Sequence, residues 1–132
     1  MSDALAIQVE ISPGELLDKL TILEIKRAKI DAPEKRANID REHAMLADIR
    51  MRAVPADAEI ERLETELKSV NQALWTIEDD IRDCERNQDF GDAFIRLARA
   101  VYRTNDRRAA LKREINDRLG ARFAEEKSYG DY

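Results

Sequence analysis

Apolar residues in the stretch 59–89 recur at alternating spacings of three and four positions. This is the heptad pattern of a helix that packs against other helices, as in a coiled coil. At about 1.5 Å per residue, such a helix is roughly 45 Å long and is not stable alone in water. The pattern therefore predicts a central helix covered by the rest of the chain, with a seam formed by Ile60, Leu63, Leu67, Val70, Leu74, Ile77, Ile81 and Cys84.

The chain before this helix contains a strand-like stretch and two helical segments. Residues 5–11 alternate apolar and non-apolar positions, which is the period of a β-strand. Residues 12–15, with the sequence Ser-Pro-Gly-Glu, form a capping box with proline at the first helical position. A similar signal recurs at 31–34. These signals predict helices at about 12–30 and 34–52, and Asp57 is placed to cap a third helix over 57–88.

The chain after Gln88 predicts a fourth helix, over 92–119, because a short break is followed by a second apolar seam. Asp89 is the expected N-cap and Gly120 the expected stop. The short connection requires the third and fourth helices to run antiparallel as a hairpin. The fourth seam consists of Phe94, Leu97, Val101, Thr104, Arg108, Leu111 and Ile115.

These elements predict an all-α antiparallel bundle built around a long helical hairpin, with a short strand-like N-terminal segment. A length of 132 residues fits one domain, over 1–132. Hydrophobic residues make up 43% and charged residues 39%, a mixture that suits narrow buried stripes on long helices. We expect a cytoplasmic protein without a membrane span, because the apolar runs are short and the single cysteine, Cys84, cannot form an internal disulfide.

Charge is distributed unevenly along the chain. Residues 1–89 carry 13 Lys or Arg against 21 Asp or Glu, whereas residues 90–132 carry 10 against 7. Packing of an acidic helix against a basic one explains this asymmetry, and nucleic-acid binding is the alternative. We expect no nucleic-acid partner, because the chain is acidic overall, with a net charge of −5. The residues on which the alternative depends form a basic ridge on the fourth helix: Arg96, Arg99, Arg103 and Arg107.

A candidate ligand site lies along polar stripes that flank the two seams. In the antiparallel hairpin, Trp75 comes level with Asn105, and Glu78 with Tyr102. An aromatic wall beside convergent polar groups is typical of a small-molecule site. The alternative is a hydrogen-bond network that fixes the register of the helices. The candidate residues are Asn71, Trp75, Glu78, Arg82, Tyr102, Asn105 and Lys112.

Catalytic and metal sites have weaker support. A ferritin-like di-metal site requires two Glu-x-x-His motifs, and the chain has one histidine, His43. Helical nucleotide pyrophosphohydrolases hold Mg²⁺ with two carboxylate pairs, and pairs of this form occur at Glu61 with Glu64 and at Glu114 with Asp117. Such pairs arise readily by chance in a chain this rich in charge. We therefore expect no metal site and no cofactor.

Three segments resemble a family of small bacterial, all-helical proteins of unknown function. They are residues 11–26, residues 74–82 with the pattern Leu-Trp-x-Ile-Glu-Asp-x-Ile-Arg, and residues 102–116 together with the Glu-Glu-Lys-Ser-Tyr sequence at 125–129. The resemblance covers most of the chain except the second helix. It implies no particular activity.

The sequence thus favours a non-enzymatic binding or adaptor protein with a small polar ligand or a protein partner. The alternative is a Mg²⁺-dependent enzyme acting on a nucleotide or a nucleotide sugar. We also expect a homodimer, because a lone strand at 5–11 needs a partner for its backbone groups. That partner is either the same strand in a second subunit or the tail around 123–129.

Overall fold

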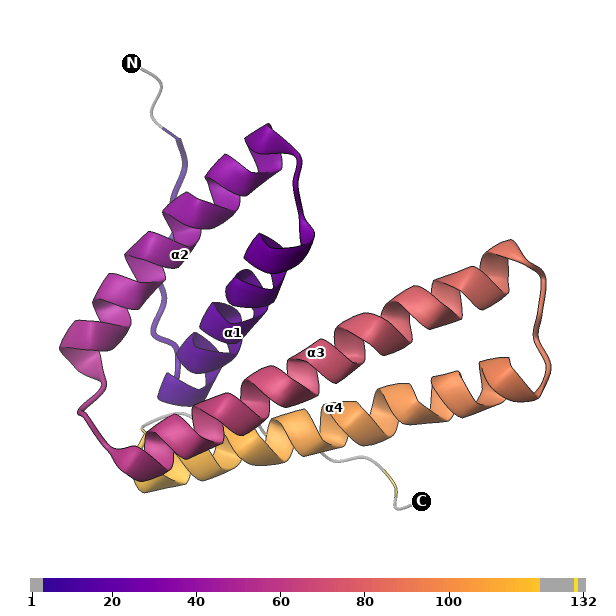
Figure 1. Cartoon of the computed structure of the whole chain (residues 1–132). Coiled ribbons are helices and arrows are strands. Elements are labelled where there is room, and N and C mark those ends of the chain that lie inside the picture. Colours follow the sequence, from indigo (N-terminus) through magenta and orange to yellow (C-terminus); the bar gives the residue numbers. More distant parts are fainter. Residues whose placement is uncertain (1–3, 122–129, 131–132) are drawn as a thin grey trace.

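The computed structural model describes residues 4–121 and 130. Within this part of the chain it contains four helices, α1 (Pro13–Lys29), α2 (Pro33–Ala53), α3 (Ala58–Arg86) and α4 (Asp92–Arg118) (Figure 1). The all-α fold class and the bundle arrangement are confirmed. The helix bounds lie close to those that the sequence predicts.

Helix α1 begins where the sequence places its capping signal. The hydroxyl oxygen of Ser12 accepts a hydrogen bond from the backbone N–H of Glu15 at 3.1 Å, and Pro13 occupies the first helical position. The apolar face of α1 is almost completely buried, and Leu17 has 0% exposure. Full burial of a leucine side chain stabilises the fold by about 1.5–3 kcal/mol. Helix α1 is therefore part of the core, and it also contributes residues to the site described below.

Local signals also fix most ends of the long hairpin. Asp57 caps α3 by accepting hydrogen bonds from the backbone N–H groups of Glu59 and Ile60. Gly120 has a φ of +63°, the left-handed conformation expected just after a helix. The proposed N-cap role of Asp89 is wrong: the N-cap of α4 is Gly91, and the Asp89 side chain instead accepts from the Gly91 N–H at 3.1 Å within the turn.

The acidic third helix and the basic fourth helix pack against each other, and ion pairs between described residues join α4 to α3 and to the N-cap of α3. Arg107 contacts Glu66 with an N···O distance of 2.7 Å, and Arg118 contacts Asp57 at 3.0 Å. Both pairs are partly exposed, so each contributes little to stability. They show that basic side chains of α4 pair with acidic side chains at α3, as the uneven charge distribution along the chain predicts.

Helix α1 is the central packing element, because it packs closely on α2, α3 and α4, whereas the backbone of α2 comes close to that of α1 alone among the described helices. The α1–α2 pair diverges from the hairpin, so it covers only the half of α3–α4 that lies away from the α3–α4 turn (Figure 1). The main core lies in this covered half. It consists of Leu16, Leu17, Leu20, Leu23, Ile39, Leu46, Val54, Ile60, Leu63, Leu67, Leu111 and Ile115.

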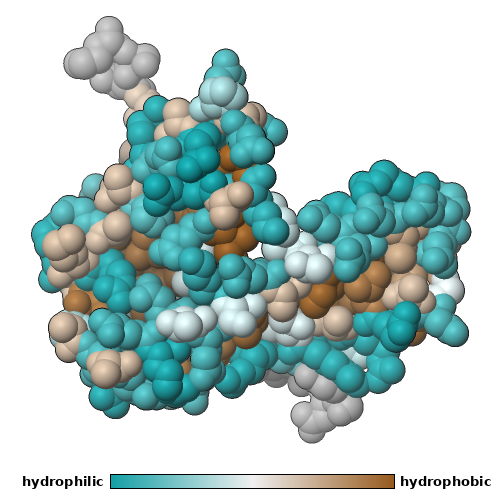
Figure 2. All heavy atoms as spheres, in the orientation of Figure 1, coloured by the Kyte–Doolittle hydropathy of each residue, from teal (hydrophilic) through white to brown (hydrophobic). Residues whose placement is uncertain are grey.

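The other half of the hairpin has only α3 and α4 to cover its seam. Ile77, Ile81, Leu97 and Val101 are half-buried there, although they continue the same heptad pattern. An apolar stripe bordered by hydrophilic surface is visible along this part of the hairpin (Figure 2). The point where α1 leaves the hairpin therefore forms a notch with apolar and polar walls.

The strand-like segment predicted at 5–11 does not form a strand in the described chain. These residues lie outside any helix and are exposed, with Leu5 at 89%, Ile7 at 79% and Val9 at 73% exposure. Pairing with a second subunit therefore stays a prediction, and pairing with the tail falls on residues outside the described ones. Among the described residues, no helix is both long enough and apolar enough to cross a membrane.

Candidate functional site

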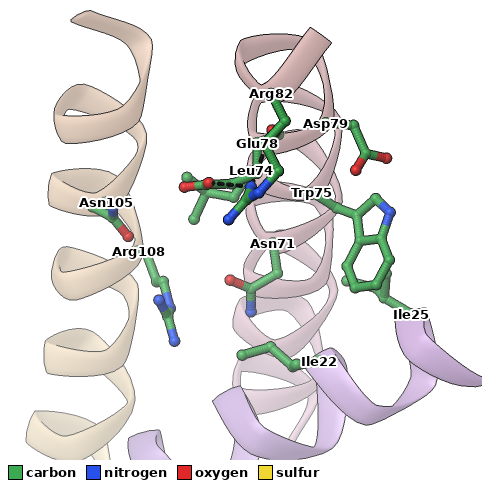
Figure 3. Close-up of a pocket in the computed structure, with 10 residues that line it drawn as sticks. All are labelled: Ile22, Ile25, Asn71, Leu74, Trp75, Glu78, Asp79, Arg82, Asn105 and Arg108. Carbon is green, nitrogen blue, oxygen red and sulfur yellow. Dashed lines mark hydrogen bonds and ion pairs between the residues drawn. The ribbon is translucent and has the colours of Figure 1, made fainter. Parts of the chain in front are cut away.

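A cavity of about 510 Å³ lies in the notch between α1, α3 and α4, and we call it the cleft cavity. Its volume falls within the range of about 300–1,000 Å³ typical of small-molecule sites. Its walls come from α1, α3 and α4 (Figure 3). The lining residues are Ile22, Ile25, Asn71, Leu74, Trp75, Glu78, Asp79, Arg82, Asn105 and Arg108.

One wall of the cleft cavity is aromatic and apolar. The indole of Trp75 is half-buried and lies beside Ile25 of α1, on the side of α3 that faces away from α4 (Figure 3). Asp79, one helical turn further along, extends on this same side of α3. This wall therefore combines a flat ring, aliphatic carbon and a carboxylate.

The part of the cavity nearer α4 is polar. Arg82 binds Glu78 within α3, with a distance of 2.7 Å between Nη1 and Oε2, and Asn105 faces this pair from α4 (Figure 3). The Glu78 and Arg82 side chains are 44% and 64% exposed. Their ion pair is therefore solvated and readily rearranged.

A buried ion pair forms the floor of the cleft cavity. The carboxylate of Asp18, 1% exposed, accepts hydrogen bonds from Nε and Nη2 of Arg108, the first at 2.8 Å. It also accepts from Nδ2 of Asn71 at 2.9 Å, and the same Nδ2 lies 3.0 Å from Oγ1 of Thr21. We call Asp18, Thr21, Asn71 and Arg108 the polar floor.

The polar floor holds Asp18 in its charged form. Burial by itself raises the pKa of this carboxyl, but hydrogen bonds from Arg108 and Asn71, together with the positive charge of Arg108, outweigh it. The pKa of Asp18 is therefore lowered from its ordinary value of 3.8. The floor thus presents a charge-matched pair at neutral pH.

Further polar contacts fix α1 on α4 next to the floor. Lys112 binds Glu15 of α1 at 2.8 Å, and Oδ1 of Asn116 accepts a hydrogen bond from the backbone N–H of Gly14, also at 2.8 Å. A side chain at position 14 would place its Cβ 2.6 Å from the carbonyl oxygen of Lys112. Glycine is therefore required there for the close approach of the two helices.

The structure brings together five of the seven residues predicted for the site. Asn71, Trp75, Glu78, Arg82 and Asn105 all line the cleft cavity. Lys112 and Tyr102 do not line it. Lys112 is buried against Glu15, whereas the side chain of Tyr102 is 41% exposed elsewhere on α4. Whether the five residues bind a ligand stays a prediction.

The two interpretations of the polar stripes apply to different residues. Asn71 belongs to a buried hydrogen-bond network, as the register hypothesis requires, because it joins α3 to Asp18 and Thr21 of α1. Trp75, Asp79 and Asn105 border the open part of the cavity instead. The site therefore has a structural floor and an accessible upper part.

Sequence reasoning missed Asp18, Thr21 and the role of Arg108. A signal for them was present, since Asp18 interrupts the apolar face of α1 and Arg108 occupies a seam position of α4. Charged residues at core positions of packed helices are expected to have charged partners. The identity of the partner could not be deduced, because 90 positions separate the two residues.

Two of the four carboxylates proposed for Mg²⁺ binding are engaged in other contacts. Glu64 binds Arg50 of α2 at 2.7 Å, and Asp117 lies near Arg113 of its own helix at 3.8 Å. Within the described residues, no group of three or more His, Cys, Asp or Glu side chains is placed to hold a metal ion. No observation at these positions favours the Mg²⁺-dependent alternative.

A second cavity, of about 450 Å³, is lined by residues of α1, α2 and α3. His43 borders it, with a half-buried side chain 3.6 Å from Glu24. Glu24 also binds Lys68 at 3.0 Å, and Arg50 with Glu64 completes the charged lining. Each charged group here already has a partner of opposite sign, so this cavity is explained as a set of ion pairs between helices.

Comparison with known proteins identifies the family. A family model described as a family of unknown function, DUF6165, matches residues 7–131. The chain belongs to this family. The resemblance noted from the three sequence segments is therefore confirmed at the level of a family of unknown function. No curated protein and no solved structure matches the chain. The function must accordingly be argued from the geometry of the site.

Proposed function

We propose that this member of DUF6165 is a non-enzymatic binding protein, and that its ligand is a small polar molecule held in the cleft cavity. The observation that carries the proposal is the combination of an open cavity of about 510 Å³ with an aromatic wall and convergent amide, carboxylate and guanidinium groups. Pockets of this size that combine apolar walls with a few polar groups are the usual sites for small ligands.

The polar floor supports binding rather than proton-transfer chemistry. A general acid or base at neutral pH needs a pKa near the working pH, whereas the pKa of Asp18 is lowered below 3.8 and its carboxylate is bound to Arg108. The floor therefore acts as a rigid support. The lining residues outside the floor, such as Trp75, Asp79 and Asn105, would then contact the ligand.

A thermal-shift screen tests the proposal, because a ligand that binds only the folded state raises its melting temperature. The panel contains nucleotides, nucleotide sugars, amino acids and amines, each with and without Mg²⁺. We expect at least one compound to stabilise the protein and to lose its effect in Trp75→Ala. Tyr102→Ala is the matched control, since it removes an aromatic ring from the same hairpin but outside the cavity.

The outcomes of this screen separate the two candidate functions. A Mg²⁺-dependent shift with a nucleotide, followed by its turnover, would replace our proposal with the enzyme alternative. A shift that persists equally in Trp75→Ala would place the site elsewhere. No shift with any compound, under conditions where the protein is folded, would contradict a small-ligand function for the cleft cavity.

We also propose that the protein acts as a cytoplasmic homodimer, and that residues 5–11 of two subunits pair as antiparallel strands. The exposure of Leu5, Ile7 and Val9 supports this proposal, because the segment is open to a second copy, and a side-by-side pairing of identical strands would satisfy backbone groups and close on itself. Deletion of residues 1–10 should then produce a monomer in light scattering. A full-length monomer, or a dimer that survives the deletion, would contradict it.

A further inference from the structure

We infer that the ligand of the cleft cavity carries a positively charged organic group, seated between the indole of Trp75 and the carboxylate of Asp79. This inference rests on the proposed binding function and names the chemical class of the ligand. It follows from the net charge of the cavity, from the position of the Trp75 ring, and from the ion pairs that Arg82 and Arg108 already form.

The charges around the cavity leave one carboxylate unmatched. Arg82 is paired with Glu78 at 2.7 Å, and Arg108 is paired with Asp18 of the floor at 2.8 Å. Asp79 is the remaining charged residue of the lining, and within the described chain its side chain forms no hydrogen bond or ion pair. The cavity with its floor therefore has a net charge of −1, which favours a cationic ligand.

The indole of Trp75 lies on the same side of α3 as the Asp79 carboxylate, so one cation could contact both groups. Trp75 and Asp79 extend from the same side of α3, away from the Glu78–Arg82 pair, and the Trp75 indole lies beside Ile25 of α1 (Figure 3). The face of an indole attracts an ammonium or guanidinium group within about 6 Å, and tryptophan is the strongest of the aromatic side chains in this interaction. Ile25 completes this wall and can contact the alkyl part of the ligand.

An anionic ligand would meet less favourable groups. The guanidinium of Arg108 is held by a carboxylate that is 1% exposed, so drawing it toward an anion would leave Asp18 buried without a counter-charge. Arg82 is more exposed, but releasing it from Glu78 would leave the Glu78 carboxylate to repel the same anion. The lining therefore selects against negative charge on the ligand.

The single tryptophan of the chain allows a direct test, since Trp75 fluorescence reports on this wall alone. The full-length protein is titrated with butylammonium, butanol and butyrate, which share a carbon chain and differ in charge. We expect a saturable change in Trp75 emission that is strongest for butylammonium. Asp79→Asn should weaken its binding by roughly tenfold, which corresponds to ~1.4 kcal/mol.

Asp80→Asn is the matched control, because Asp80 is exposed on the same helix, loses the same charge and does not line the cavity. It should bind butylammonium as the unmodified protein does. Equal loss in both variants would show only a general charge effect and would overturn the inference. Tighter binding of butyrate or butanol would overturn it as well, while leaving the binding function intact. No binding of any probe would also refute it, and the thermal-shift screen would then decide the function separately.

Discussion

Removal of the buried charge at Asp18 should destabilise the fold more than any other conservative change in the polar floor. The Asp18 carboxylate accepts two hydrogen bonds from Arg108 and one from Asn71. Asp18→Asn keeps the shape of the side chain but removes the negative charge that Arg108 contacts in the polar floor, and it places an amide donor among donors. Breaking a buried ion pair by removing one partner typically costs about 3–5 kcal/mol.

The expected value lies at the low end of this range. The side chain of Arg108 is 29% exposed, so water can partly replace the hydrogen bonds that the guanidinium loses with Asp18. We expect a loss of about 3 kcal/mol in the free energy of unfolding, measured by urea denaturation followed by circular dichroism. Asp80→Asn, at an exposed position, should change it by less than about 0.5 kcal/mol.

A double-variant cycle and a pH series make the reasoning refutable. Asp18→Leu combined with Arg108→Leu should cost less than the sum of the single changes, because both charges of the pair are removed together.

A pH series tests the same ion pair. The folded-state pKa of Asp18 is lowered, so the contribution of this carboxylate to the free energy of unfolding is present above the ordinary value of 3.8 and is lost as the pH falls through the lower folded-state value. The difference between the protein and Asp18→Asn should therefore shrink in acid. A loss below about 1 kcal/mol at neutral pH, or a difference that does not depend on acid, would contradict the assignment.

Three further predictions follow from particular contacts. Gly14→Ala should destabilise the protein by about 1–3 kcal/mol in the same urea assay, because its Cβ would lie 2.6 Å from a backbone oxygen of α4; an unchanged midpoint would mean that α1 and α4 lie further apart. Glu78→Ala should cost no more than about 0.5 kcal/mol, since its ion pair with Arg82 is exposed, and a loss of several kcal/mol would mean that this pair is buried. The basic ridge should give no measurable binding of DNA or RNA even at low salt, and a sub-micromolar complex would refute this expectation.

The helices and their ends were predictable because their signals are local. Ser12 and Asp57 cap the helices that the sequence assigns to them, since a hydroxyl or carboxylate needs only the next few backbone N–H groups. The N-cap prediction for Asp89 was wrong because Gly91 also lies near the start of α4 and is its N-cap. The Asp89 side chain accepts a hydrogen bond from the Gly91 N–H within the turn instead.

The site was only partly predictable, because its geometry depends on where α1 crosses the hairpin. The heptad register correctly placed Trp75 and Asn105 along one cavity. It could not show that the Trp75 indole lies beside Ile25, or that Lys112 forms an ion pair with Glu15, because Ile25 and Glu15 both lie on α1. Side-chain periodicity specifies which face of a helix is buried but does not identify the helix that covers it.

Nuclear magnetic resonance mapping of a ligand from the thermal-shift screen tests the central claim most directly. The indole N–H of Trp75 gives a resonance that no other residue of the chain can produce. We predict that the ligand shifts this resonance together with backbone amides around Asn71–Arg82 of α3 and Asn105–Arg108 of α4. Saturable shifts confined to α2 or to residues 5–11, with the indole signal unmoved, would contradict a binding site in the cleft cavity.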